Sequence, residues 1–252
     1  MLQEIIDSHC HLDFPKFNRD RQEAIERARH AGVVEIINSG VNQKTNLSTL
    51  ELTREYGHIH ATLGLSPGVA ASASKEEIEG ILSQIEQHIE MAVSVGEAGL
   101  DYYHCRTDSG RARQLVVFKK VIEIAETTDS AIVIHARDAE EEVFKLVQHL
   151  DRVVFHCYSG SLETMKLITD AGHYVSLATL VCFSEHHQSL AKYIPFDRLL
   201  IETDSPYLSP RKGRNEPALL VDAVTVIAKL RGIKDSEVAR MTAENTRRIF
   251  GL

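Results

Sequence analysis

Two histidines near the start of the chain have the spacing of metal ligands. His9 and His11 lie at the end of an apolar run that begins at Ile5. Because side chains alternate along a strand, both imidazoles point to the same face. Two imidazoles on one face can bind one divalent cation. A His-x-His pattern also occurs in surface turns, so its meaning depends on the rest of the chain.

Further side chains with ligand chemistry stand at corresponding points of later apolar runs. Glu97 interrupts the small, apolar run 93–100, and a buried carboxylate without a partner is costly. His135 and His156 end two successive runs, and Asp204 ends the last one. Each alone could be a core, capping or rim residue. Residues with unrelated structural roles would not be expected to lie at the same depth along successive strands, so the set predicts a metal site.

The number of these residues points to two divalent ions. The candidate ligands are His9, His11, Glu97, His135, His156 and Asp204. Their number is larger than the number of protein ligands that one catalytic metal ordinarily has. Because none of them is cysteine, they suit Zn2+, Mn2+ or Mg2+ in an open catalytic site. A carboxylate can bridge two cations, so Glu97 is the expected bridge. Asp204 is expected to complete one metal shell, orient the attacking water and take its proton.

Other polar residues are placed to support this chemistry. Asp7 and Glu202 each precede a ligand by two residues and are expected to orient it. Arg137 lies on the same face of its run as His135. The loop after the last run carries Arg211, Lys212 and Arg214. Loops at this point of an α/β barrel commonly bind phosphate, so we expect an anionic substrate, although a solvated basic loop is the alternative.

The elements that must position these residues alternate regularly. Short β-branched runs begin near Ile5, Val33, Ile59, Ala92, Ala131, Val153, Tyr174 and Leu199. Amphipathic stretches lie between them at 19–31, 43–56, 75–90, 110–127, 139–150 and 161–171. This alternation predicts parallel strands with right-handed crossovers, closed as a single (β/α)8 TIM barrel over residues 1–252. Residues 235–250 are expected to form an extra C-terminal helix on the outside.

Composition limits the classes of function. The chain has 252 residues and a net charge of −8, which disfavours passive coating of nucleic acid. Its 4 cysteines form no Cys-x-x-Cys pair. The start, residues 1–5, has no signal-peptide pattern, and no run approaches the length of a membrane span. We therefore expect a cytoplasmic protein with no membrane attachment, and nothing indicates an obligate protein partner.

These motifs resemble those of the TatD family of metal-dependent deoxyribonucleases. They are the segments 7–12 (DSHCHL), 96–102 (GEAGLDY), 135–139 (HARDA), 156–160 (HCYSG), 202–208 (ETDSPYL) and 215–217 (NEP). The resemblance covers nearly the whole chain and implies a binuclear site made by the same set of ligands. It also implies hydrolysis of phosphodiester bonds in DNA, often from a single-stranded or frayed end.

One departure from the family pattern concerns the substrate. The family usually carries Gly-x-His-Pro-His after the third strand, where this chain has Ser66 and Gly68. The first of those histidines is expected to face the substrate. Ser66 can donate one hydrogen bond to it but supplies no positive charge. Two alternatives therefore stay open: a metal-dependent hydrolase of an ester, amide or aminoacyl ester, and a non-catalytic barrel whose metals only stabilise the fold.

Overall fold

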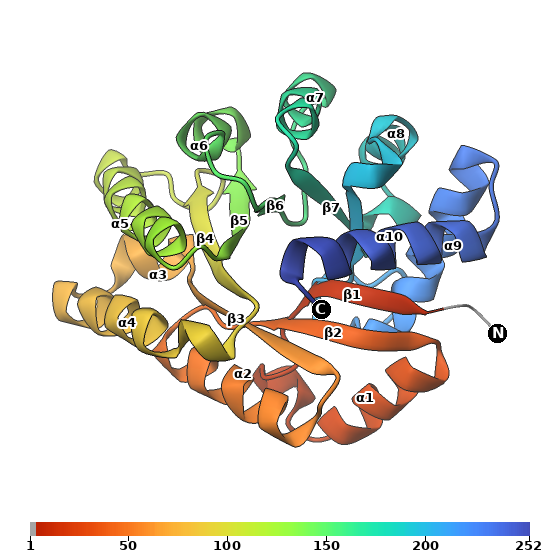
Figure 1. Cartoon of the computed structure of the whole chain (residues 1–252), viewed down its shortest axis with the longest axis horizontal. Coiled ribbons are helices and arrows are strands. Elements are labelled where there is room, and N and C mark those ends of the chain that lie inside the picture. The colour runs from red at the N-terminus through yellow and green to blue at the C-terminus, as the bar shows by residue number, and fades with distance from the viewer. Residues whose placement is uncertain (1–3) are drawn as a thin grey trace.

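A computed structural model describes residues 4–252 of the chain. Residues 1–3, which belong to the predicted domain and to the segment without a signal-peptide pattern, lie outside the described residues. Its strands are β1 (Ile5–Cys10), β2 (Val33–Ser39), β3 (Ile59–Leu65), β4 (Ser94–Asp101), β5 (Ala131–Arg137), β6 (Val153–Phe155), β7 (Tyr174–Ala178) and β8 (Leu199–Glu202). They pair in parallel in chain order and form the centre of the molecule, with the helices around them (Figure 1). The predicted (β/α)8 barrel is confirmed.

The ring of strands is joined across its last gap by backbone hydrogen bonds. Asp204 N donates to the carbonyl of His9 at 3.0 Å, and His11 N donates to the carbonyl of Ser205 at 2.8 Å. The ends of β1 and β8 are thereby fixed to each other. Three of the predicted ligands lie on these two chain segments.

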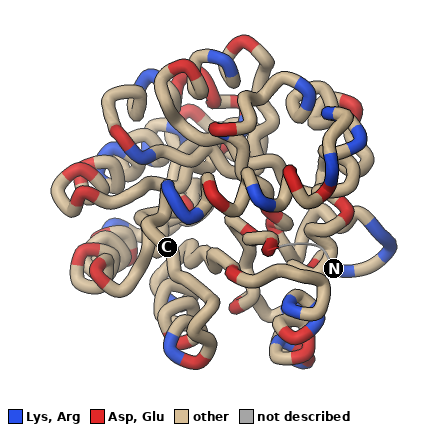
Figure 2. Tube along the Cα trace, turned by 45° about the vertical axis from the view of Figure 1, so that its right-hand side comes forward, with Lys and Arg blue, Asp and Glu red and all other residues tan. Residues whose placement is uncertain are grey.

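The helices surround the barrel. They are α1 (Arg21–His30), α2 (Gln43–Glu55), α3 (Pro67–Ser72), α4 (Lys75–His88), α5 (Asp108–Thr127), α6 (Glu140–Val147), α7 (Leu162–Asp170), α8 (Glu185–Tyr193), α9 (Leu220–Arg231) and α10 (Asp235–Phe250). Helices α3, α8 and α9 lie outside the amphipathic ranges predicted from the sequence. Acidic and basic positions are interspersed along the trace (Figure 2).

Alternation along β5 explains why its last histidine faces the barrel mouth. Ile132 and Ile134 are buried outward, in the apolar layer under the helices. Val133 is buried in the barrel interior, where it clusters with Val154. His135 shares the parity of Val133, so it continues the interior face at the carboxyl end of the strand.

The C-terminal helix α10 does more than cover the outside of the barrel. It lies beside β1, but its last residues, Ile249 and Phe250, join the interior cluster that contains Val133 and Leu200. They close the end of the barrel opposite to the strand ends that carry the ligands. The predicted extra C-terminal helix is confirmed, and its last two residues also contribute to the barrel interior.

Two glycines let three strands approach one another around Glu97. A Cβ at Gly64 would collide with the backbone of Gly96 and Glu97. Gly96 has φ +127°, and a Cβ there would collide with the carbonyl oxygen of Val133. Thr62 Oγ1 donates to the carbonyl of Gly96 at 2.7 Å and fixes this approach. Only glycine fits where the backbone must pass this closely.

We expect Gly64→Ala to destabilise the protein by about 1–3 kcal/mol, because an added methyl group in a packed site forces backbone shifts. Urea unfolding measures the difference. Gly80→Ala is the matched control, since a Cβ at Gly80 in α4 meets nothing within 4 Å. If both variants unfold at the same urea concentration, the close approach of β3 to Glu97 is not a constraint on stability.

Candidate metal centre

His9 of β1 and His11, which follows the end of that strand, lie close to each other and to one carboxylate. His9 Nε2 and His11 Nε2 are 3.3 Å apart, and Asp204 Oδ1 lies 3.9 Å from the first and 3.6 Å from the second. His11 is held from behind, where its Nδ1 lies 2.8 Å from the carbonyl of Ser39, and its ring stacks on Phe14. The three ligand atoms lie within 4.8 Å of one another and could hold one metal ion.

Glu97 lies between this pair of histidines and a second pair. Its Oε2 is 3.3 Å from His9 Nε2 and 3.6 Å from His11 Nε2. Its Oε1 is 2.7 Å from His135 Nδ1 and 3.5 Å from His156 Nε2. The two carboxylate oxygens thus face different pairs of imidazoles, which is the arrangement that a carboxylate shared by two cations requires. The structure brings all of the predicted ligands together.

Burial and charge oppose each other in this cluster. Burial raises the pKa of Glu97, but His156 and His135 outweigh it and hold that pKa well below its usual range. Burial also raises the pKa of Asp204, and His11 brings it below its usual value. Burial lowers the pKa of His11, yet Asp204 and Glu97 raise it to about 9. Both carboxylates are therefore ionised near neutral pH, as metal ligands must be.

The predicted supporting carboxylates contact the site in different ways. Glu202 Oε1 lies 3.4 Å from His156 Nδ1 and accepts a hydrogen bond from Cys157 N at 2.7 Å. Asp7 contacts no ligand ring: its Oδ1 accepts from Thr203 N at 2.9 Å and its Oδ2 from Thr203 Oγ1 at 2.6 Å. Glu202 is thus placed to orient an imidazole, whereas Asp7 braces the backbone that carries the last carboxylate ligand.

The sequence analysis missed one residue of this surrounding layer. Asp101 Oδ2 lies 3.1 Å from His135 Nε2 and 2.8 Å from His104 Nδ1. Gln114 of α5 fixes its backbone by accepting from Asp101 N at 3.0 Å. The signal was present in the spacing, because Asp101 follows Glu97 by four residues on β4 and so shares its face.

A cleft of about 540 Å³ at the carboxyl ends of the strands is lined by five of the six predicted ligands, His11, Glu97, His135, His156 and Asp204, whereas His9 is fully buried and does not line it. Ser66 and Arg137 lie in its walls, as both were predicted to do. The Arg137 guanidinium lies over the ring of Tyr103, 4.5 Å from its centroid. Ser66 stands at the start of α3, where its side chain caps no backbone N–H. The cleft therefore offers the Arg137 cation and the Ser66 hydroxyl beside the ligand cluster.

The chain matches one known protein family. The sequence model of the TatD related DNase family matches residues 6–251. The chain belongs to this family. Its resemblance to TatD enzymes, inferred from the motifs, is confirmed, and so is its class as a TatD-family metal-dependent hydrolase.

Individual members of the TatD family align over almost their full length. A Methanocaldococcus jannaschii protein named as the uncharacterized metal-dependent hydrolase MJ1582 is 38% identical over 97% of this chain and 96% of its own. The 3'-5' ssDNA/RNA exonuclease TatD of Salmonella typhimurium is 32% identical over 98% of both chains. The crystal structure of the Escherichia coli TatD homolog YJJV superposes with a TM-score of 0.90 at 28% identity, over 98% of both chains.

The basic loop of this TatD-family chain is arranged differently from the expectation. Arg211 is paired with Asp222, with nitrogen-to-oxygen distances of 2.6 and 2.7 Å. Arg214 is paired with Asp20 at 2.7 and 2.8 Å. Lys212 is exposed, and none of the three side chains lines the cleft in the part of the chain that the structure describes. Two of the three cations of this loop are thus paired with carboxylates, and phosphate binding by the loop stays a prediction.

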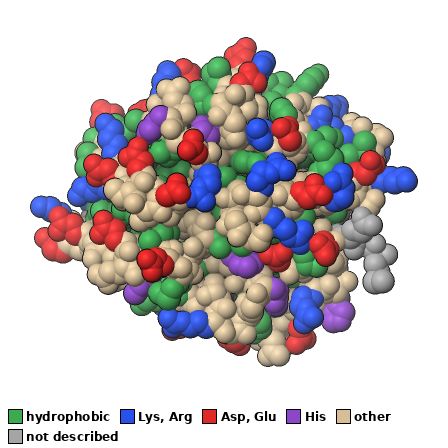
Figure 3. Space-filling model, viewed as in Figure 1, with side chains coloured by type: hydrophobic (Ala, Val, Ile, Leu, Met, Phe, Trp, Pro, Cys, Tyr) green, Lys and Arg blue, Asp and Glu red, His purple; other side chains and the backbone are tan. Residues whose placement is uncertain are grey.

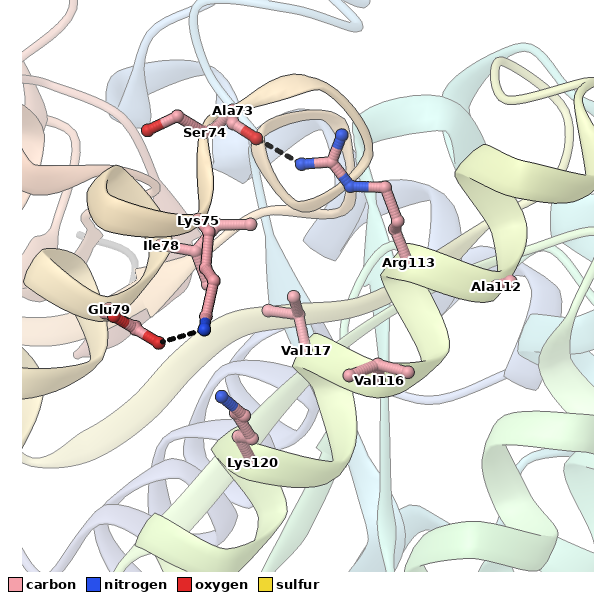
Figure 4. Close-up of a pocket in the computed structure, with 10 residues that line it drawn as sticks. All are labelled: Ala73, Ser74, Lys75, Ile78, Glu79, Ala112, Arg113, Val116, Val117 and Lys120. Atoms are coloured by element: carbon pink, nitrogen blue, oxygen red, sulfur yellow. Dashed lines mark hydrogen bonds and ion pairs between the residues drawn. The ribbon is translucent and has the colours of Figure 1, made fainter.

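A second hollow lies on the outer wall of the barrel. It has a volume of about 600 Å³ between α4 and α5, with Lys75, Arg113 and Lys120 around Ile78 and Val117 (Figure 4). None of the predicted ligands lines it.

Within residues 4–252, no helix has the length and apolar character needed to span a bilayer.

Proposed function

We propose that this chain is a two-metal phosphodiesterase that removes nucleotides from single-stranded or frayed DNA ends. The observation that carries the proposal is the position of Glu97, whose two oxygens face separate pairs of imidazoles. The name of the Salmonella relative, an exonuclease of single-stranded DNA and RNA, supports the substrate class. Acidic and basic side chains are mixed on the face of the molecule seen in Figure 3.

The chemistry of the residues present fits divalent cations. Nitrogen and carboxylate oxygen atoms converge, and two triads have all ligand atoms within 4.8 Å. One triad combines His9 and His11 with Asp204, and the other combines His9 and His156 with Glu97. No cysteine contributes a ligand atom in the described residues, which suits Zn2+, Mn2+ or Mg2+ in a catalytic site. We propose two such ions, with Glu97 shared between them.

In this proposal the side chains have separate tasks. Bound divalent cations lower the pKa of water and stabilise negative charge on a phosphate. Asp204, ionised at the cleft floor, orients the attacking water and takes its proton. Glu202 and Asp101 hold the rings of His156 and His135 from behind. Arg137 at the wall binds a phosphate oxygen.

The proposal is tested with an end-labelled single-stranded DNA and metal-stripped protein. We expect no cleavage without metal and a ladder of shortened products after addition of Mg2+, Mn2+ or Zn2+. The ladder also gives the direction of cleavage. Absence of cleavage with every metal, in protein that contains two bound ions, would contradict the nuclease proposal.

We expect Arg137→Ala to raise KM for single-stranded DNA about tenfold, because it removes a charge-assisted hydrogen bond to phosphate. Arg137 has no carboxylate partner within residues 4–252, so its charge is available. Arg211→Ala is the matched control and should change KM less than about twofold, since Asp222 already neutralises it. Equal effects of the two variants would argue against Arg137 as the phosphate contact. Initial rates at varied DNA concentration measure both.

Removal of metal should destabilise the protein. A ligand that binds only the folded state at a thousand times its Kd contributes about 4 kcal/mol, or a shift in Tm on the order of 10 °C at this chain length. We expect chelation to lower the Tm by that amount, and added Zn2+ or Mn2+ to restore it. Glu97→Ala should show little shift on chelation, because it lacks the shared ligand. A wild-type Tm insensitive to chelation would contradict a structural contribution from bound metal.

A second candidate substrate class is favoured by one residue. Ser66 stands in the cleft wall where the family usually has a histidine, and it offers a neutral hydroxyl. The apolar side chains of Val41, Leu180 and Leu208 line the same cleft. These walls would suit the substrate of a metal-dependent esterase or amidase, including one that acts on aminoacyl esters. Its test is hydrolysis of acyl substrates that survives Arg137→Ala.

A further inference from the structure

One imidazole in the cleft has no place among the ligands. His104 lies in the loop between β4 and α5, its side chain is 66% exposed, and it lines the same cleft as Ser66 and His135. Its Nδ1 lies 2.8 Å from Asp101 Oδ2. Within residues 4–252 its Nε2 has no hydrogen-bond partner. The ring is therefore held by one nitrogen and offers the other to whatever occupies the cleft.

The carboxylate that holds His104 also holds a ligand. Asp101 Oδ2 lies 3.1 Å from His135 Nε2, so one oxygen serves both rings. Asp101 Oδ1 accepts from the backbone N of His104 at 2.8 Å. An ionised carboxylate only accepts hydrogen bonds, so both imidazoles donate to it. His104 is thus oriented with Nε2 free, beside the His135 side of the cluster.

Among the described residues that line the cleft, His104 is the one imidazole outside the proposed ligand set. A guanidinium such as that of Arg137 donates hydrogen bonds but does not give up its proton in proteins. Hydroxyl groups such as that of Ser66 are much weaker acids than an imidazolium. Departure of a nucleoside oxygen from phosphorus is slow unless that oxygen is protonated or otherwise stabilised as it leaves.

We propose that His104 is the proton donor to the leaving oxygen in phosphodiester hydrolysis, an inference that rests on the function proposed above. A bond forms between phosphorus and the water oxygen, and the bond between phosphorus and the leaving nucleoside oxygen breaks. The proton of the water goes to Asp204, and the proton on His104 Nε2 goes to the leaving oxygen. The Asp101 carboxylate holds the ring through Nδ1 during the transfer, and solvent returns the proton afterwards.

The test compares two leaving groups in His104→Ala. A nucleoside oxygen needs a proton as it leaves, whereas p-nitrophenolate does not. We expect kcat for single-stranded DNA to fall about 10²-fold or more, and kcat for the p-nitrophenyl ester of thymidine 5'-phosphate to fall less than about threefold. Metal content and Tm should be unchanged. His149→Ala is the matched control, since His149 is also exposed and paired with a carboxylate, Glu126, at 2.7 Å, outside the cleft.

The remaining outcomes separate this inference from the function on which it rests. If wild-type protein cleaves DNA but His104→Ala loses the same factor on both substrates, or on neither, the proton-donor role is wrong. Loss of bound metal in His104→Ala would also overturn it, because the residue would then act through Asp101 and His135. If metal-loaded wild-type protein cleaves neither substrate, the nuclease proposal itself has failed.

Discussion

Glu97→Ala is expected to abolish DNA cleavage, with a loss of at least about 10³-fold in kcat/KM, because a single change removes a ligand from both proposed ions. The wild-type carboxylate has oxygens 2.7 Å from His135 Nδ1 and 3.3 Å from His9 Nε2, one toward each side. Metal analysis of the purified variant should show fewer than two ions per chain. Steady-state rates on end-labelled DNA measure the loss.

The control for this change is Glu90→Ala, which removes an exposed carboxylate from the turn before β4. It should leave metal content and rate unchanged. Glu97→Gln keeps the shape of the side chain and should also lose metal, because an amide is a poor bridge between cations. A Glu97→Ala variant that retains two ions and most of its activity would contradict the shared-ligand assignment.

Asp204→Asn carries the second large expected effect. An amide keeps an oxygen in place but cannot take a proton from water, so we expect kcat to fall about 10²–10⁴-fold. The Asp204 side chain is only 16% exposed and lies beside His9 and His11 at the cleft floor. Metal content and Tm should stay near those of the wild type, and both are measured on the same preparation.

This variant also decides between an enzyme and a non-catalytic barrel. If Asp204→Asn loses activity but keeps its bound metal and its fold, the ions do more than stabilise the structure. Full activity in Asp204→Asn would show that another group takes the proton. The matched control is Asp197→Asn, an exposed carboxylate in the turn before β8.

The sequence by itself determined the barrel and which candidate ligand residues meet at one end of it. Strand period placed His9 and His11 on one face, and the alternation of Val133 with Ile134 turned His135 toward the interior. Because parallel strands end at one rim, residues from distant segments had to meet there. These consequences follow from local periodicity and topology, which is why they could be predicted.

Only the tertiary structure decided which partners the remaining polar groups take. Arg211 and Arg214 bind Asp222 and Asp20 instead of facing the cleft, and Asp101 joins His104 to His135 through one oxygen. Such pairings depend on the paths of loops and on side chains that are far apart in sequence. Local periodicity does not predict either of them. A pattern of residue types establishes that a group is charged, but the folded chain decides whether that charge is already neutralised.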